Sequence, residues 1–491
     1  MSSGAPSLPV GWLLENGHEV RMELLMSILQ KHTLITGTSG WGKTGFLLSI
    51  IVGLLLRPRC PGIVLIDPKG EAAEELRDRF LPALAAEGKV AIRPEQIVSI
   101  QPFGKYGVPL NPLCPIPGIS TEVQANVCCN LLSTLVDGGF EARMTSILSW
   151  LLRVVIAAHG SLVDVQRLLV DEGYASVLAG RLQDEELRRY LLVILPSEPR
   201  TSIEALRSRL DWLLLLPAIR GMLAAPGCIR GSDLIEAPLV IIDLSGAPMG
   251  FQALTRFVGS LLFQLIVAAI FDRKVGPSTQ PVLLVVDEWH QLAKILASDF
   301  EQVLSLARFK KIGLWLANQT LAQVSESSKV LAESLKTNIA LHLAFRPNPA
   351  DVRALSSLLP ITGARIHPDY PDRLLTKSEE EKYLVNLLGS LPPRQALLAN
   401  HVTGQADVIR TLDLPYEEAR RRAEQLPEDI LDRYVRGRLG VPVKDLIARG
   451  KATTEPLDAQ PARQKAARAT KGATKARRRT SAGRTKLVVP S

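Results

Sequence analysis

The segment from residue 37 to residue 44 carries the clearest chemical pattern in the chain. It reads Gly-Thr-Ser-Gly-Trp-Gly-Lys-Thr and matches the phosphate-binding pattern GxxxxGK[ST] between an apolar strand pattern and a helical one. Glycines let backbone N–H groups curl around a phosphate chain, and the helix start adds partial positive charge. The residues predicted to bind nucleotide here are Gly37, Thr38, Ser39, Gly40, Trp41, Gly42, Lys43 and Thr44.

Within this loop, two side chains have distinct predicted roles. Lys43 is expected to reach the β- and γ-phosphates, and the Thr44 hydroxyl is expected to bind Mg²⁺. Trp41 is unusual, because a small residue is common at that position. Its ring either covers the nucleotide, packs on a neighbouring subunit, or is a tolerated surface aromatic.

A second pattern is the apolar run Val282-Leu-Leu-Val-Val followed by Asp287 and Glu288. In a chain with a phosphate-binding loop, a strand that ends in two carboxylates is typical of a Walker B element. Asp287 is then expected to hold the Mg²⁺ shell. Glu288 is expected to accept a proton from the attacking water or to orient it. Acidic residues after strands are common, so this assignment depends on the loop.

Two further strand ends carry polar side chains. Gln319 ends the run Gly313-Leu-Trp-Leu-Ala-Asn-Gln, where it is predicted to sense the γ-phosphate or position water; the alternative is a helix-capping residue. Asp67, with Lys69, follows a buried strand in Ile-Asp-Pro-Lys-Gly-Glu. We predict that Asp67 lies at the nucleotide site, although Asp-Pro before a helix is equally an ordinary turn.

The elements that must position these residues follow an interrupted α/β pattern. Continuous apolar strands alternate with helices over 33–110 and again from 237 onward, which indicates a mostly parallel sheet covered on both faces. Residues 112–232 carry almost only helical spacing. The predicted division is a first part of an ATPase domain at 1–111, an all-α insertion at 112–232, a second part at 233–412, closing helices at 413–450 and a disordered basic tail at 451–491.

Composition limits the other possibilities. The 491 residues are 46% hydrophobic and 22% charged, which is ordinary for globular domains, and the odd count of five cysteines argues against a disulfide framework. The net charge of +9 comes from the tail, because residues 459–491 contain ten Lys or Arg and no acidic residue. Residues 1–458 then contain 48 basic and 49 acidic residues. Such a polycation predicts salt-dependent, sequence-independent DNA binding; a solubilising role or an anionic membrane surface are the alternatives.

These pieces together resemble the HerA/FtsK superfamily of DNA-pumping ATPases, and within it the type IV coupling proteins and conjugative-transfer ATPases of the TraG/TraD type. The matching segments are HTLITGTSGWGKT, VLIDPKGE, VPLNPL, LVIIDLS, LLVVDEWHQLA, ARFKKIGLWLANQT and LAFRPNPADVRAL. The resemblance covers roughly residues 10–410 and implies a RecA-like P-loop NTPase fold that binds ATP and Mg²⁺.

The resemblance also implies an assembly. It implies a homo-hexameric ring with nucleotide at the subunit interfaces, DNA in the channel, and a relaxase or secretion-system components as partners. An arginine given to the neighbouring site in trans is implied as well. Arg308 in ARFKK is the preferred candidate and Arg346 in AFRP the second; a solvated arginine is the alternative for either.

One departure from the membrane-anchored coupling proteins is the absence of a predicted transmembrane segment, since no apolar run reaches 18 residues. We expect a cytoplasmic protein, which is either a soluble relative of these proteins or one that meets a membrane through partners. The predicted function is an ATP-hydrolysing motor that translocates DNA in conjugative or type IV secretion-type transfer. A motor acting on protein substrates and a nucleotide-gated, non-catalytic scaffold are the alternatives.

Overall fold

The computed structural model describes residues 6–15, 18–116, 118–135, 139–320, 328–352, 355, 358–368 and 370–454. The basic segment 459–491, with its predicted DNA affinity, lies outside the described residues. The last described helix, α21 (Val443–Thr454), continues past residue 450, so residues 451–454 are helical where the sequence predicted a disordered tail.

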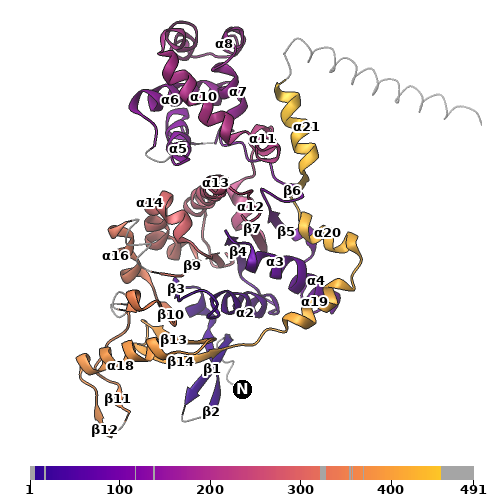
Figure 1. The fold of residues 1–491 in the computed structure, drawn as a ribbon. Helices are drawn as coiled ribbons and strands as arrows, with labels where there is room; N and C mark the ends of the chain where they lie inside the picture. Colours follow the sequence, from indigo (N-terminus) through magenta and orange to yellow (C-terminus); the bar gives the residue numbers. More distant parts are fainter. Residues whose placement is uncertain are drawn as a thin grey trace, which may run out of the picture.

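The core of the fold is an eleven-stranded mixed sheet with helices on both faces (Figure 1). In spatial order its strands are β2 (His18–Leu25), β1 (Ser7–Glu15), β14 (Gln405–Thr411), β13 (Gln395–Asn400), β10 (Leu341–Phe345), β3 (Thr33–Thr36), β9 (Ile312–Asn318), β8 (Val282–Val286), β4 (Gly62–Asp67), β7 (Leu239–Asp243) and β5 (Ile97–Ile100). The strands from β10 to β5 are parallel to one another. The predicted mostly parallel α/β fold is confirmed.

The central strands are buried along their whole length because both faces of the sheet are covered. Alternate side chains enter two different apolar clusters: Leu34 and Val286 lie in one, whereas Ile35 and Val285 lie in the other. Helix α2 (Lys43–Leu55) packs into the second cluster, and α13 (Gln252–Asp272) and α14 (His290–Leu306) into the first. This two-sided burial explains why the strands read as continuous apolar runs.

Strand order brings the candidate residues to one edge. β9 lies between β3 and β8, and all three are parallel, with Thr36 opposite Asn318 and Val286 opposite Leu316. The residues that come after these strands therefore meet at the carboxyl edge of the sheet, where ligands bind in open α/β sheets.

Only helices lie between β6 (Tyr106–Gly107) and β7 in the described part of this stretch, as the spacing predicts. They are α5 (Thr121–Ser133), α6 (Ala142–Ala157), α7 (Leu162–Leu168), α8 (Glu172–Ala179), α9 (Glu185–Arg189), α10 (Arg200–Leu213), α11 (Pro217–Ala224) and α12 (Gly231–Ile235). Helices α6, α8 and α10 form a lobe away from the sheet, and α21 at the end of the described chain packs on α11 (Figure 1).

Several elements differ from the sequence prediction. The β1–β2 hairpin and β14 are not predicted; together with β13 they extend the sheet in antiparallel fashion. Helix α14 begins at His290, directly after the Walker B pair. The helical stretch after β4 consists of α3 (Glu71–Glu74), a π-helical segment (Glu75–Phe80) and α4 (Leu81–Ala86).

The remaining described elements extend from the sheet or close the chain. They are α1 (Met26–Leu29), α16 (Lys329–Asn338), β11 (Ile366–His367), β12 (Tyr370–Leu374), α18 (Lys377–Ser390), α19 (Tyr416–Glu424), α20 (Glu428–Arg436) and β15 (Val441–Pro442). Helix α13 is long and apolar enough to cross a membrane, but 67% of its apolar window is buried inside the protein. Its apolar residues are therefore accounted for by the core.

Candidate active site

The phosphate-binding loop connects β3 to α2 through three glycines with positive φ. Gly37 has φ 144°, Gly40 has φ 80° and Gly42 has φ 108°, values that side chains rarely allow. A Cβ on Gly37 would also lie 2.5 Å from the Cβ of Phe345. The loop conformation therefore depends on glycine, as the motif requires.

Lys43 begins α2 and turns back over the loop. Its Nζ donates hydrogen bonds to the carbonyl oxygens of Gly37 (2.6 Å) and Thr38 (3.0 Å), and the residue is 6% exposed. Burial lowers the pKa of Lys43, while the charges of Glu288 and Asp287 partly offset that effect. The ammonium group is thus held above the loop where phosphate oxygens are expected.

Asp287 faces the loop from the end of β8. The Thr44 hydroxyl donates to Asp287 Oδ2 at 3.5 Å, and the backbone N–H of Glu288 donates to Asp287 Oδ1 at 2.9 Å. Burial raises the pKa of Asp287 to about 7, with further contributions from the negative charges of Asp67 and Glu288. A bound cation would relieve this cost of a buried carboxylate.

The oxygen donors present suit magnesium. Mg²⁺ takes few protein ligands and completes its shell with phosphates and water. Thr44 and Asp287 supply a hydroxyl and a carboxylate, and no group of three or more potential ligands of the His, Cys, Asp or Glu type occurs among the described residues. The predicted pair therefore fits a nucleotide-bound Mg²⁺ rather than a site built from protein ligands alone.

Glu288 is held by residues from two other strand ends. Its Oε1 accepts a hydrogen bond from Gln319 Nε2 at 2.8 Å and forms an ion pair with Lys69. Burial would raise the pKa of Glu288, but these contacts outweigh it and lower the pKa below its usual range. Glu288 also has φ 43°, a left-handed conformation that costs free energy in a non-glycine residue. The structure thus brings Glu288 and Gln319 together, and their roles in hydrolysis stay predictions.

Lys69 contacts Glu288, and the sequence analysis assigned no role to this lysine. It lies in the turn after β4, within the Ile-Asp-Pro-Lys-Gly-Glu segment at this edge of the sheet. The order of the strands explains the contact, because β4 is the direct neighbour of β8. A lysine after a strand has no distinguishing pattern of its own, so only the Ile-Asp-Pro-Lys-Gly-Glu segment could have indicated Lys69.

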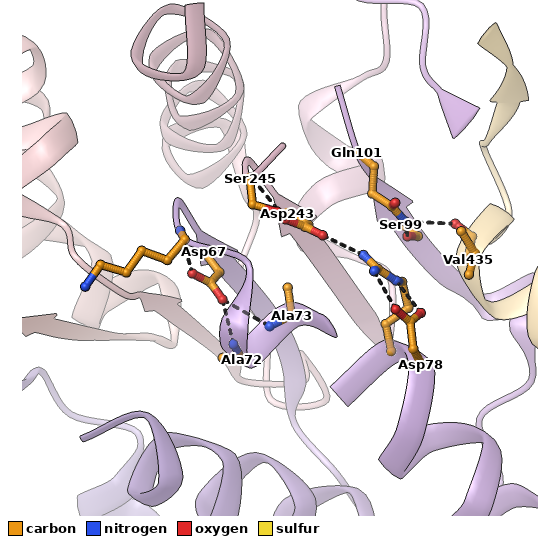
Figure 2. Close-up of polar contacts among 11 residues, drawn as sticks. Asp67, Ala72, Ala73, Asp78, Ser99, Gln101, Asp243, Ser245 and Val435 are labelled. Atoms are coloured by element: carbon orange, nitrogen blue, oxygen red, sulfur yellow. Dashed lines mark hydrogen bonds and ion pairs between the residues drawn. The ribbon is translucent and has the colours of Figure 1, made fainter. Parts of the chain in front are cut away.

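Asp67, predicted to lie at the nucleotide site, accepts hydrogen bonds from backbone N–H groups of the turn that follows it. Its Oδ1 accepts from the backbone N–H of Lys69 (3.0 Å), and its Oδ2 accepts from those of Ala72 (2.8 Å) and Ala73 (3.1 Å), as Figure 2 shows. The geometry therefore favours the turn interpretation: Asp67 holds the start of α3 and adds negative charge near Asp287.

The next strand end, β7, carries a separate charged cluster. Asp243 forms a buried ion pair with Arg77 (2.9 Å) and accepts from the Ser245 hydroxyl (2.6 Å), and Arg77 also pairs with Asp78 (Figure 2). These contacts join β7 to the π-helical segment that covers the sheet. The cluster stabilises the fold beside the site and has no direct contact with the phosphate-binding loop.

The two candidate arginines lie at opposite ends of the parallel strands, Arg346 after the carboxyl end of β10 and Arg308 before the amino end of β9. The carbonyl oxygen of Arg346 accepts the backbone N–H of Thr38 at 3.1 Å, and its guanidinium lies 5.1 Å from the centre of the Trp41 ring. Arg308 instead precedes the amino end of β9, about 20 Å from the loop by the length of that strand. Arg346 thus contacts its own loop, and the role of either arginine in trans stays a prediction.

Two family models match the chain over the segments that form this site. "Helicase HerA, central domain" matches residues 8–104, and "TraM recognition site of TraD and TraG" matches residues 281–360. The first range contains the phosphate-binding loop and Lys69, and the second contains Glu288 and Gln319. The resemblance to HerA-type and conjugative-transfer ATPases is confirmed. No curated protein matches the sequence.

Solved structures give the same fold at low sequence identity. The bacterial conjugative coupling protein TrwB is 13% identical with a TM-score of 0.51, over 79% of this chain and 87% of that one. TrwB in complex with ADP and Mg²⁺ has a TM-score of 0.53 at 13% identity, over 84% and 96%. VirB4 of Thermoanaerobacter pseudethanolicus is 15% identical with a TM-score of 0.52, over 85% and 99%. These likenesses show a RecA-like P-loop NTPase fold.

Proposed function

We propose that this protein is an ATP-hydrolysing motor that translocates DNA in conjugative or type IV secretion-type transfer. The observation that carries the proposal is the convergence of three groups at one sheet edge: the phosphate-binding loop with Lys43, the Thr44–Asp287 pair and the Glu288–Gln319 pair. This is the set that phosphoryl transfer to water requires: phosphate binding, cation binding and control of the attacking water.

Each residue has a separate task in the proposed reaction. Lys43 and the loop N–H groups bind the β- and γ-phosphates of ATP, and Thr44 with Asp287 would hold Mg²⁺, which neutralises charge on the phosphates when bound. Glu288 takes the proton of the attacking water. Gln319 orients Glu288 and the water, since its amide already donates to that carboxylate.

The assembly is part of the proposal. We infer a homo-hexameric ring with DNA in its channel and Arg308, or alternatively Arg346, acting at the neighbouring site. The likeness to TrwB, whose structures include complexes with ADP and Mg²⁺ and with an ATP analogue, supports ATP and Mg²⁺ as ligands. We infer a relaxase or secretion-system component as partner from the match to the family model "TraM recognition site of TraD and TraG". Membrane attachment would then come through those partners.

Hydrolysis assays with and without DNA test this proposal. Wild-type protein should hydrolyse ATP faster with double- or single-stranded DNA present, and Lys43→Ala and Glu288→Gln should abolish turnover. Glu288→Gln should still bind ATP, whereas Lys43→Ala should not. An assembled ring whose ATPase rate is indifferent to every DNA offered would contradict the DNA-motor assignment.

A motor acting on protein substrates remains the second candidate, because the chain before residue 459 carries 48 basic against 49 acidic residues and so has no overall attraction for DNA. Removing residues 459–491 separates the two. If DNA-stimulated hydrolysis survives the truncation, the core itself engages DNA. If DNA affinity vanishes while hydrolysis and assembly persist, the protein-substrate motor is favoured. A non-catalytic scaffold would bind ATP without releasing phosphate.

A further inference from the structure

A large cavity lies at the amino ends of the strands, away from the phosphate-binding loop. It has a volume of about 1190 Å³ and is lined by parts of α5, α12, α13 and α14, together with Gly62 and Val282, which begin β4 and β8. Pockets for small molecules measure about 300–1,000 Å³. This cavity is therefore large enough to hold a short stretch of polypeptide.

One wall of the cavity is a row of apolar side chains that face solvent. Val123 and Val127 of α5 are 54% and 40% exposed, and Ile119, just before the helix, is 38% exposed. The two valines are four residues apart and so lie on one face of the helix. Leu265 and Ala269 of α13 also line the cavity. An apolar row of this kind is typical of a binding site for an apolar segment.

The cavity wall also carries a buried acceptor without a donor. Gln264 Oε1 accepts no hydrogen bond from the described residues, while the amide nitrogen of the same side chain donates to Asp299. Burial raises the pKa of Asp299, so a lysine or arginine brought by an occupant would be favourable at this point. This preference is local, because the charged lining residues balance overall: Arg230, Arg273, Lys274, Glu236, Asp272 and Asp299.

One segment of this chain combines the matching features. Residues 484–490 read Arg-Thr-Lys-Leu-Val-Val-Pro, and the run from Leu487 to Val489 contains the only large apolar side chains after Leu457. Residues 455–486 separate this run from the end of α21, and these 32 residues can span roughly 100 Å. A folded body of about 450 residues has a radius of gyration of only about 22 Å, so the cavity is within reach.

We propose that residues 484–490 dock in this cavity of their own chain. The run from Leu487 to Val489 packs on the α5 wall, and Lys486 or Arg484 donates to Gln264 Oε1. Docking then holds the basic segment between α21 and Leu487 against the folded body at both of its ends. The inference goes beyond the proposed function and does not depend on it, because docking requires neither ATP nor DNA.

The thiol of Cys228 reports whether the cavity is covered, because Cys228 is a lining residue and Cys60 is not. Both cysteines are partly buried, and burial raises the pKa of each thiol to about 12, so their intrinsic reactivities are similar. Full-length Val488→Asp should react with N-ethylmaleimide at Cys228 about tenfold faster than wild type, since loss of one buried apolar side chain costs enough binding free energy for that factor. The rate at Cys60 should not change. Peptide mass spectrometry after timed labelling measures both rates.

Ser481→Asp is the matched control, because it adds the same charge to the tail outside the apolar run. It should leave both labelling rates at their wild-type values. A Cys228 rate in Val488→Asp equal to that of wild type would overturn the proposal. A wild-type Cys228 rate that slows with rising protein concentration would also overturn it, since a second copy would then cover the cavity.

A photocrosslinker in place of Val488, such as p-benzoylphenylalanine, gives a second measurement on the full chain. It should become joined to α5 or α13 in a product that has the mass of one chain. Crosslinks confined to other elements, or a product with the mass of two chains, would contradict docking within the chain.

Discussion

Two neighbouring strands of this sheet have a buried aspartate at or directly after their last residue, yet the two side chains have different roles. Asp67 at the end of β4 is 0% exposed and accepts three backbone N–H groups of its own turn. Asp287, directly after β8, is 4% exposed, accepts one backbone N–H, and faces the Thr44 hydroxyl. An acid after a strand thus becomes a structural cap or a ligand group according to the path that the backbone takes next.

The backbone takes a different path after each aspartate. After Asp67 the chain turns through Gly70 into α3, so the first N–H groups of that helix point back at the carboxylate. After Asp287 the backbone turns left-handed at Glu288, and α14 starts only at His290. Asp287 therefore faces Thr44 in α2, and Glu288 faces Gln319 and Lys69 at neighbouring strand ends, instead of their own helix. Substitutions at these strand ends test the contrast.

The largest effect is expected at Glu288. Glu288→Gln keeps the size of the side chain but removes its capacity to take a proton, so kcat should fall about a thousandfold while ATP binding is retained. Single-turnover hydrolysis and fluorescent-nucleotide binding measure the two quantities. A loss below tenfold would show that another group activates the water.

Asp287→Asn should lower kcat about a hundredfold at ordinary Mg²⁺ concentrations, because the neutral amide binds the cation more weakly. Part of the loss should be recovered by raising the Mg²⁺ concentration. A magnesium titration of the hydrolysis rate measures this, with removal of Mg²⁺ by EDTA as the wild-type reference. An unchanged Mg²⁺ requirement would argue against Asp287 as a ligand.

Gln319→Ala should cost about tenfold in kcat, the effect expected for one hydrogen bond to a charged group. KM for ATP should change little, because the contact that is lost is with Glu288 rather than with the loop. Steady-state kinetics separate the two parameters. If KM rises and kcat does not fall, Gln319 acts on nucleotide binding and the contact with Glu288 is incidental.

Asp67→Asn tests the aspartate that holds its own turn, and it is expected to have the smallest effect on turnover. The amide can replace one oxygen acceptor but not both, so the free energy of unfolding should fall by about 2 kcal/mol. The kcat of the folded protein should stay within about threefold of wild type. Urea unfolding and ATPase assays check the two expectations. A loss of kcat as large as that of Asp287→Asn would mean that both aspartates act on the nucleotide.

Local pattern was enough to predict many central elements. The strands β3, β4, β8 and β9 and helix α2 occur close to where apolar runs and glycines predict them, because a parallel sheet covered on both faces demands continuous apolar strands. The helical stretch between β6 and β7 was also predictable from its spacing. The antiparallel β1, β2 and β14 were missed, since strands of mixed polarity at the side of a sheet carry a weaker pattern than the continuous apolar runs of its centre.

Residue types and their order along the chain were sufficient to identify the phosphate-binding loop, the paired acids and the terminal glutamine as one chemical set. Only the tertiary structure decided that β9 lies between β3 and β8, that Asp67 is used by its own turn, and that Lys69 reaches Glu288. The physical reason is that a motif depends on the local backbone, whereas contacts between strand ends depend on the order of the strands. That order is decided by the burial of segments that are distant in sequence.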